Sequence, residues 1–359
     1  MFRGEVVYLY AFDVANEITT SQIKQVLGLK PRSFEIRVDR TTPKDVPLYK
    51  PLAVEPQIGV QLHGQTACIL IRIYDVGVVS VTVRVPYSVS RLGDLVPFHN
   101  PKLESGETLD ALARRLCVDI CQSIRPYLIR SSVPSEPEAY TVFCCTDLDG
   151  AQDTGAWLRS ERRNVAGLLT ETDPEVLSDI QVEEALRLQR SFEKTDLVMI
   201  DWDAALVVDL TGYTEDVLYI LELANLQLEE FRAMDQTLDR FLDRAYDDLE
   251  HTTTFLFGST GLVLRKLRRI RVDVTKLSDE VTHITKFFGD WHLARVYLAA
   301  RERFYLEHWG RSVEQRLAQL DQLYSVFHSD VNERRMLWLE IIIVILFIVD
   351  VVGLFLFKL

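Results

Sequence analysis

An apolar run near the end of the chain constrains the fold more than any other feature of the sequence. Residues 336–357 read MLWLEIIIVILFIVDVVGLFLF, a run of 22 residues with two acids and no base. About 20 apolar residues in a helix are enough to cross a hydrocarbon layer of about 30 Å. The run therefore predicts one C-terminal transmembrane helix, which would hold the rest of the chain at a bilayer.

Basic residues beside this run predict the side of the membrane on which the bulk of the chain lies. Arg334 and Arg335 precede the run and Lys358 follows it, and this slight excess places the N-terminal bulk in the cytoplasm. The first residues, MFRGEVVYLYAFDV, are typical of a strand and of neither a signal peptide nor a transit peptide. We expect a bacterial inner membrane location, with the mitochondrial inner membrane as the alternative.

The composition fits a globular body ahead of the anchor. Hydrophobic residues make up 48% of the chain and charged residues 26%, which is ordinary for folded domains. A formal net charge of -13 argues against general binding to nucleic acid or anionic lipid, which a surplus of Lys and Arg would favour. The five cysteines are an odd number and suit reduced thiols, so they imply no disulfide framework.

Strand patterns and helix patterns alternate through residues 1–210, which predicts an α+β head domain with a mixed, largely antiparallel sheet. The segments 67–74 and 78–85 form one predicted hairpin, and 197–200 with 206–210 form another around Asp201, Trp202 and Asp203. Further strands are predicted at 5–12 and 140–145, and helices at 19–27, 109–127 and 175–192.

The pattern changes at residue 211, after which the chain lacks proline and becomes helical. Apolar residues step by three and four from Leu221 to Leu249, and only Asp235 interrupts them. A second pattern begins at Leu277 and resumes after Gly310. This spacing predicts a long antiparallel helical hairpin, similar to a coiled coil, over residues 211–335, followed by the anchor at 336–357. Gly289 and Gly310 are the places where the second helix would bend or break.

Residues 215–355 resemble the C-terminal half of the "required for meiotic nuclear division" family of bacterial and mitochondrial membrane proteins. The resemblance rests on LELANLQLEEF at 221–231, on FFGDWHLARVYLAARERFYLEHW at 287–309, and on LEIIIVILFIVD in the anchor. Glu340 and Asp350 stand ten residues apart, as the two acids of the family do, although Asp350 replaces an expected Glu. The resemblance implies a tethered, self-associating scaffold, and only through it is contact with a ribosome or RNA expected.

The two acids inside the apolar run are the strongest candidates for a functional role. An ionisable group in hydrocarbon costs about 2.5 to 3.5 kcal/mol, so Glu340 and Asp350 should face protein or water. Their spacing of ten residues places them on adjacent faces of a helix, where carboxyls of neighbouring chains could share hydrogen bonds in a homo-oligomer. A proton or ion path through Asp350 is one alternative, and an interfacial position for Glu340 is another.

A basic cluster marks the predicted tip of the helical hairpin. Arg265, Lys266, Arg268, Arg269 and Arg271 place five bases within seven residues, beside Gly258 and Gly261. Such a cluster could bind an anion or a partner. The glycines lack the spacing of a phosphate-binding loop. The alternative is a solvated tip in which the apolar side chains of Leu264, Leu267 and Ile270 pack together.

Other polar patterns favour structural roles. Asp235, Asp239, Asp243 and Asp247 repeat every four residues, and we expect Arg232, Arg240 and Arg244 to neutralise them. No cysteine or histidine spacing matches a metal site, and no nucleophile motif is present, so no metal, cofactor or catalytic residue is predicted. Trp202 should pack on its own sheet, with a partner contact as the alternative.

Together these patterns predict a tail-anchored, non-enzymatic cytoplasmic scaffold that forms a homo-oligomer and recruits partners to the membrane. Two other classes of function stay open as alternatives. One is an oligomeric ion- or proton-conducting assembly that uses Asp350. The other is an unrecognised enzyme or ligand sensor in the head domain.

Overall fold

The computed structural model describes residues 1–33, 51–132, 136–250, 268–275, 277, 279 and 291–356. The chain divides into two compact units, of which the first holds Met1–Ala233 and Ser278–Trp309 and the second holds Met234–Leu277 and Gly310–Leu359. The first unit is a mixed α+β domain built on a sheet, as predicted. Helix α4 (Glu215–Glu250) contributes residues to both units.

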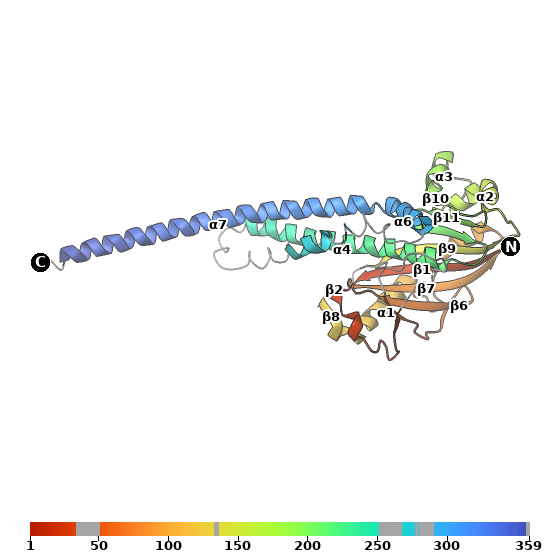
Figure 1. The fold of residues 1–359 in the computed structure, drawn as a ribbon, viewed down its shortest axis with the longest axis horizontal. Coiled ribbons are helices and arrows are strands. Elements are labelled where there is room, and N and C mark those ends of the chain that lie inside the picture. Colours follow the sequence, from red (N-terminus) through yellow and green to blue (C-terminus); the bar gives the residue numbers. More distant parts are fainter. Residues whose placement is uncertain are drawn as a thin grey trace. The chain divides into compact units, whose positions relative to one another are not determined.

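The first unit is organised around a sheet (Figure 1), which has ten strands among the described residues. The strand order is β10-β11-β12-β9-β1-β7-β6-β4-β3, with β5 paired to β6. Every pair is antiparallel except β12 with β9, which is parallel, so the prediction of a largely antiparallel sheet is confirmed. The strands are β1 Phe2–Asp13, β3 Arg32–Ser33, β4 Leu52–Val54, β5 Val60–Leu62, β6 Gln65–Ile73, β7 Val78–Val89, β9 Glu138–Leu148, β10 Gln189–Arg190, β11 Asp196–Ile200 and β12 Ala204–Asp209.

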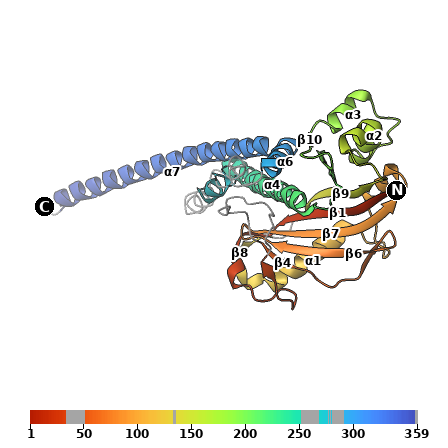
Figure 2. The same ribbon diagram turned by 45° about the vertical axis from the view of Figure 1, so that its right-hand side comes forward.

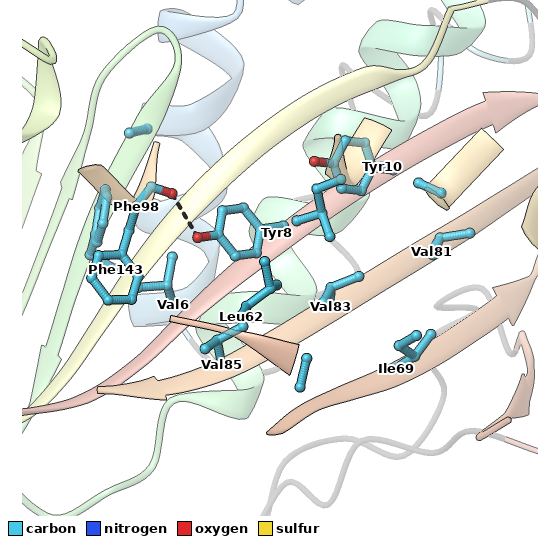
Figure 3. Close-up of a cluster of buried hydrophobic side chains, with 14 of the residues drawn as sticks. Val6, Tyr8, Tyr10, Leu62, Ile69, Val81, Val83, Val85, Phe98 and Phe143 are labelled. Atoms are coloured by element: carbon cyan, nitrogen blue, oxygen red, sulfur yellow. Dashed lines mark hydrogen bonds between the residues drawn. The ribbon is translucent and has the colours of Figure 1, made fainter. Parts of the chain in front are cut away.

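Strand β1 is central because its sequence can be buried on both faces. It pairs with β7 on one side and with β9 on the other, and an uninterrupted apolar run is what such a strand requires. Val6, Tyr8 and Tyr10 enter the main core (Figure 3), where the Tyr8 hydroxyl donates a hydrogen bond to the Phe98 carbonyl oxygen at 2.6 Å. The alternate side chains of β1 point to the opposite face of the sheet.

Helices α1 (Leu109–Ser123) and α2 (Thr154–Leu169) bury their apolar sides in this main core. Each has a capped N-terminus: the Thr108 hydroxyl accepts from Ala111 N at 3.3 Å, and an Asp153 carboxylate oxygen accepts from Ala156 N at 2.8 Å. Helix α2 was not predicted from the sequence. Its buried residues occupy the two ends of the helix, and charged residues fill the middle of it.

Several predicted elements are confirmed and two are wrong. The hairpins β6–β7 and β11–β12 form at the predicted places. The predicted helix at 19–27 is only the short turn Thr20–Gln22, because the chain closes a tight loop in which Val26 pairs with Leu29. The predicted helix at 175–192 is reduced to α3 (Asp179–Ala185), because the following residues form the edge strand β10.

Helix α4 covers the second face of the sheet and runs beside β1 in the same direction (Figures 1 and 2). All residues from 217 to 231 are buried. A coiled-coil helix would bury only one stripe, so the seam predicted for this segment is wrong within the first unit. The reason is that α4 contacts the sheet on one side and helix α6 (Trp291–Arg303) on another.

The second unit brings α4 beside helix α7 (Leu306–Leu356). Figures 1 and 2 show the two helices running in the same direction, so they are not the antiparallel pair that the sequence predicted. Of the bend or break expected at Gly310, a break is wrong, because Gly310 lies inside α7. The break instead follows Arg303, and Tyr305 there has a positive φ of 53°. Gly289 lies outside the described residues.

The end of α7 exposes an uninterrupted set of apolar side chains at 341–349. Among the residues that the structure describes, no helix combines the length and the apolarity that crossing a bilayer requires. The transmembrane helix expected at 336–357 has no support in this finding and stays a prediction.

Candidate functional site: the polar seam under helix α4

Three glutamates along α4 form an acidic stripe that faces the sheet. Glu215, Glu222 and Glu229 stand seven residues apart, which places them on one side of a helix. Each bonds to a different part of the sheet. We call the contact between this stripe and the sheet the polar seam, and it is the largest set of buried charges described in the first unit.

At the first end of the seam, Arg84 of β7 joins two acids from different elements. Its Nε donates to a carboxylate oxygen of Glu5 at 3.0 Å, and its Nη2 lies 2.6 Å from a carboxylate oxygen of Glu215. The start of α4 is thereby fixed over the β1–β7 pair. Because Glu215 is more than half exposed, this pair adds little stability but still directs the helix.

In the middle of the seam, Arg72 of β6 and Glu222 of α4 form a buried ion pair. Both side chains are almost fully shielded from water, at 6% and 2% exposure. Burial, and next the negative charge of Glu222, raise the pKa of Tyr219. Burial and the same charge raise the pKa of Tyr74. Both tyrosines therefore stay neutral and act as hydrogen-bonding groups.

At the far end of the seam, one arginine meets acids from α4 and β9. Glu229 accepts from Asp13 N at 3.5 Å, and Arg232 Nη1 lies 3.9 Å from a second oxygen of Glu229. Arg232 also pairs with Glu138 at the start of β9. Burial raises the pKa of Asp13 to about 7, although a hydrogen bond from Ser132 lowers it. This end of the seam therefore holds a carboxyl that titrates near neutral pH.

We expect Asp13→Asn to change how stability depends on pH. A carboxyl whose pKa is higher in the folded state than in the unfolded state favours unfolding once it ionises. For Asp13 the loss of stability grows as the pH rises from about 4, the pKa in the unfolded chain, to about 7, the pKa in the folded protein. Asparagine cannot ionise, so the variant should gain stability over the parent protein at pH 8 and not at pH 4. The gain is at most about 4 kcal/mol, and less to the extent that water reaches this partly exposed side chain.

Denaturant unfolding of the full chain at both pH values, followed by tryptophan fluorescence, measures this effect. Asp119→Asn, on an exposed position of α1, is the matched control and should shift stability equally at the two pH values. An Asp13→Asn variant that behaves like this control contradicts the prediction.

A second group of buried charges fixes the end of α6 to the sheet domain. Arg303 Nη1 lies 2.8 Å from a carboxylate oxygen of Glu184, and Nη2 bonds to Asp201 in the β11–β12 turn. Burial raises the pKa of Asp201, and the charge of Arg303 opposes that rise. Trp202 contacts Tyr305 with ring centroids 5.8 Å apart and is 48% exposed, and its packing on its own sheet stays a prediction.

The described part of the structure does not bring together the two acids of the apolar run and the basic residues of the predicted hairpin tip. Glu340 lies exposed on α7, whereas the side chain of Asp350 is outside the described part. Arg265 and Lys266 are also outside it. Arg268 and Arg269 are exposed on the helical stretch 268–275, and Arg271 pairs with Asp321 of α7.

The aspartate ladder of α4 is neutralised from another helix. Arg316 of α7 lies 3.2 Å from a carboxylate oxygen of Asp235 and also bonds to Asp239. Arg240 instead donates to the Gln236 carbonyl oxygen. The local arginine neutralisation predicted for Asp235 and Asp239 is therefore wrong, because a partner across the helix interface reaches them. Asp247 and Arg244 have side chains outside the described part.

The described residues hold no group of three His, Cys, Asp or Glu side chains that could bind a metal ion. The five cysteines are free, and Cys117, Cys144 and Cys145 are buried. The polar seam was not predicted from the sequence. The sequence pattern that indicates the seam is the spacing of seven residues between glutamates of a helix that is otherwise largely apolar.

The fold and the seam together define an α+β sheet protein with a long helix bound across its sheet by buried charges. A family described as "Uncharacterized protein MJ0711, N-terminal domain" matches residues 3–214, more than half of the chain, so the protein belongs to this family. The matched region ends at the residue before α4.

One similar protein is the "Uncharacterized protein MJ0711" of Methanocaldococcus jannaschii. It is 21% identical over 231 residues, which cover 63% of this chain and 68% of the relative. No solved structure matches the chain. The family match covers residues 3–214 and does not test the resemblance of residues 215–355 to the "required for meiotic nuclear division" family, which stays a prediction.

Proposed function

We propose that this protein is a membrane-anchored, non-enzymatic scaffold. In this proposal the end of α7 inserts into a bilayer within a homo-oligomer, and the sheet domain recruits partners. The observation that supports it best is the exposed apolar end of α7. Leu339 and residues 341–349 are between 48% and 70% exposed, on all sides of the helix.

A helix that is apolar on all sides needs an apolar environment. Hydrocarbon supplies one to every face of a single helix, whereas a protein partner must surround it. The apolar run continues to Phe357 in the sequence, a length that suits a bilayer. Glu340 and Asp350 then favour association with other copies, since a carboxyl in hydrocarbon is stabilised by a hydrogen bond across helices.

We propose no enzymatic role because charged groups of the seam bind one another. The most deeply buried arginine and glutamate of the seam bind each other beneath a helix, where a substrate has no access to them. Arg72 and Glu222 are the clearest case. Buried pairs of this kind favour a structural role for the head domain.

Two lysines in the apolar run are expected to release the protein from membranes. In Ile342→Lys with Leu346→Lys, each charge near the middle of a membrane helix costs about 3 kcal/mol. We expect the parent protein to stay in the membrane pellet after alkaline carbonate extraction and the variant to appear in the supernatant. The matched control is Gln315→Lys with Gln319→Lys, at exposed positions of the same helix, and it should stay in the pellet. Parent protein in the carbonate supernatant contradicts the anchor.

The oligomer is tested separately with the parent protein in detergent. Its mass measured by light scattering should be a multiple of the chain mass of 41.3 kDa, and Asp350→Asn should lower it. A monomeric parent protein contradicts self-association and leaves the anchor intact.

A further inference from the structure

The two faces of strand β7 differ sharply in polarity. Val79, Val81 and Val83 point into the main core and are fully buried. Ser80 and Thr82, on the opposite face, are equally shielded but lie on the side of α4. Val78, on the same face as Ser80, packs with Ala11, Tyr74 and Leu226 of α4. Strand β7 therefore contacts an apolar core on one side and, on the other, a layer that holds polar as well as apolar residues, which we call the polar layer.

The residues of the polar layer lie in one row across four strands. Glu138 of β9 is opposite Ala11 of β1, Ala11 is opposite Ser80 of β7, and Ser80 is opposite Arg72 of β6. Helix α4 crosses this row, because Asn225 donates to the Glu138 carbonyl oxygen at 3.1 Å and Glu222 pairs with Arg72. Ser80 thus lies beneath α4, between these two contacts.

Some polar atoms of this layer have no hydrogen-bond partner among the described residues. They are Ser80 Oγ, Thr82 Oγ1 and Asn225 Oδ1, in side chains that are at most 3% exposed. Buried polar atoms in proteins are nearly always bonded to protein or to ordered water. Internal water that bridges two or more such atoms is the usual solution.

We propose that residues 215–233 of α4 form a releasable arm, held on the sheet by a hydrated polar seam. In this proposal, internal water bridges the unbonded polar atoms of the seam and replaces its protein contacts as the helix lifts. Buried charges also regain their solvation when they are exposed. Helix α1 packs on the other face through apolar side chains. Its opening therefore recovers no solvation of buried charges.

The arm links the two units because α4 is one continuous helix. Beyond Ala233 the same helix pairs with Arg316 of α7 through Asp235 and Asp239. Release from the sheet therefore changes the freedom of a helix that also belongs to the second unit. This inference goes beyond the proposed function and does not depend on a membrane anchor.

Hydrogen exchange of the full chain tests the arm, with mass spectrometry to resolve its peptides. We expect amides of residues 215–233 to exchange at least about tenfold faster than those of α1, at denaturant concentrations too low to unfold the domain. Equal protection of the two helices overturns the proposal. The result is independent of carbonate extraction, so the arm and the anchor can fail separately.

A double variant tests the physical cause. Arg72→Met with Glu222→Gln removes both buried charges and keeps a hydrogen-bond acceptor for Tyr74. We expect exchange in residues 215–233 to slow about tenfold, with α1 unchanged. The matched control is Arg115→Met with Glu107→Gln, which alters an ion pair at the protein surface and should leave α4 exchange unaltered. Unchanged or faster exchange in the first double variant overturns the hydrated seam as the cause. If that variant does not fold, the comparison of α4 with α1 in the parent protein still decides.

Discussion

Alanine in place of Gly77 is expected to destabilise the sheet domain by about 3 to 4 kcal/mol. Gly77 ends the β6–β7 turn with φ of +98°, a conformation that costs a residue with a side chain about 1 to 2 kcal/mol. A Cβ at this position would overlap the carbonyl oxygen of Ala15. The Gly77 carbonyl oxygen accepts from Val14 N at 3.0 Å and from Ala15 N at 3.2 Å, and moving the turn weakens both bonds by about 1 kcal/mol each.

The matched control for this change is Gly64→Ala. Gly64 also has a positive φ, of +70°, but nothing lies within 4 Å of an added Cβ. The free energy of unfolding of this variant should fall only by the conformational cost of a positive φ, about 1 to 2 kcal/mol. Guanidinium unfolding of both variants measures the difference. Equal losses would mean that the contact with Ala15 does not limit the turn.

Methionine in place of Arg303 is expected to cost about 3 kcal/mol, because it leaves Asp201 buried without its cation. The Asp201 side chain is only 10% exposed, and burial already raises its pKa. Losing Arg303 raises that pKa further, so the penalty should be larger at pH 8, where the carboxyl is charged, than at pH 5. Hydrogen exchange in α6 should accelerate as well, since Arg303 fixes the end of that helix.

Arg187→Met serves as the matched control for Arg303. Arg187 pairs with Glu302 at 2.6 Å, but its side chain is 44% exposed, and exposed pairs contribute about 0 to 1 kcal/mol. Unfolding midpoints of the two variants at pH 5 and pH 8 make the comparison. A loss for Arg303→Met no greater than that for Arg187→Met would show that Asp201 tolerates the missing cation.

Local pattern was enough to predict the strands that lie inside the sheet. Residues 5–12 and 78–85 are β-branched and aromatic, and they form the centre of the sheet as β1 and β7. Local pattern failed where the same residues suit two structures. Residues 19–27 have helical spacing, but the chain there leaves the small sheet of β2 (Ala15–Ile18) and β8 (Leu128–Ser131) and closes a tight loop in which Val26 pairs with Leu29.

The candidate site was harder to predict than the strands because its partners are distant in sequence. Glu222 and Arg72 are 150 residues apart, and neither residue has a local pattern that marks it. Apolar residues at 221, 224, 228 and 231 favoured a coiled-coil seam, since they fit that spacing. In the structure, however, glutamates of this helix form ion pairs with arginines of the sheet.

The sequence by itself determined the α+β class of the head, its two hairpins and the long helix that starts after residue 214. These depend on hydrophobic period and turn residues, which act over a few positions. Only the tertiary structure decided which charges meet: Arg72 with Glu222, Arg303 with Asp201, and Arg316 with Asp235. A charge has no preferred partner until packing fixes which opposite charges share its low-dielectric surroundings, and that depends on the whole fold.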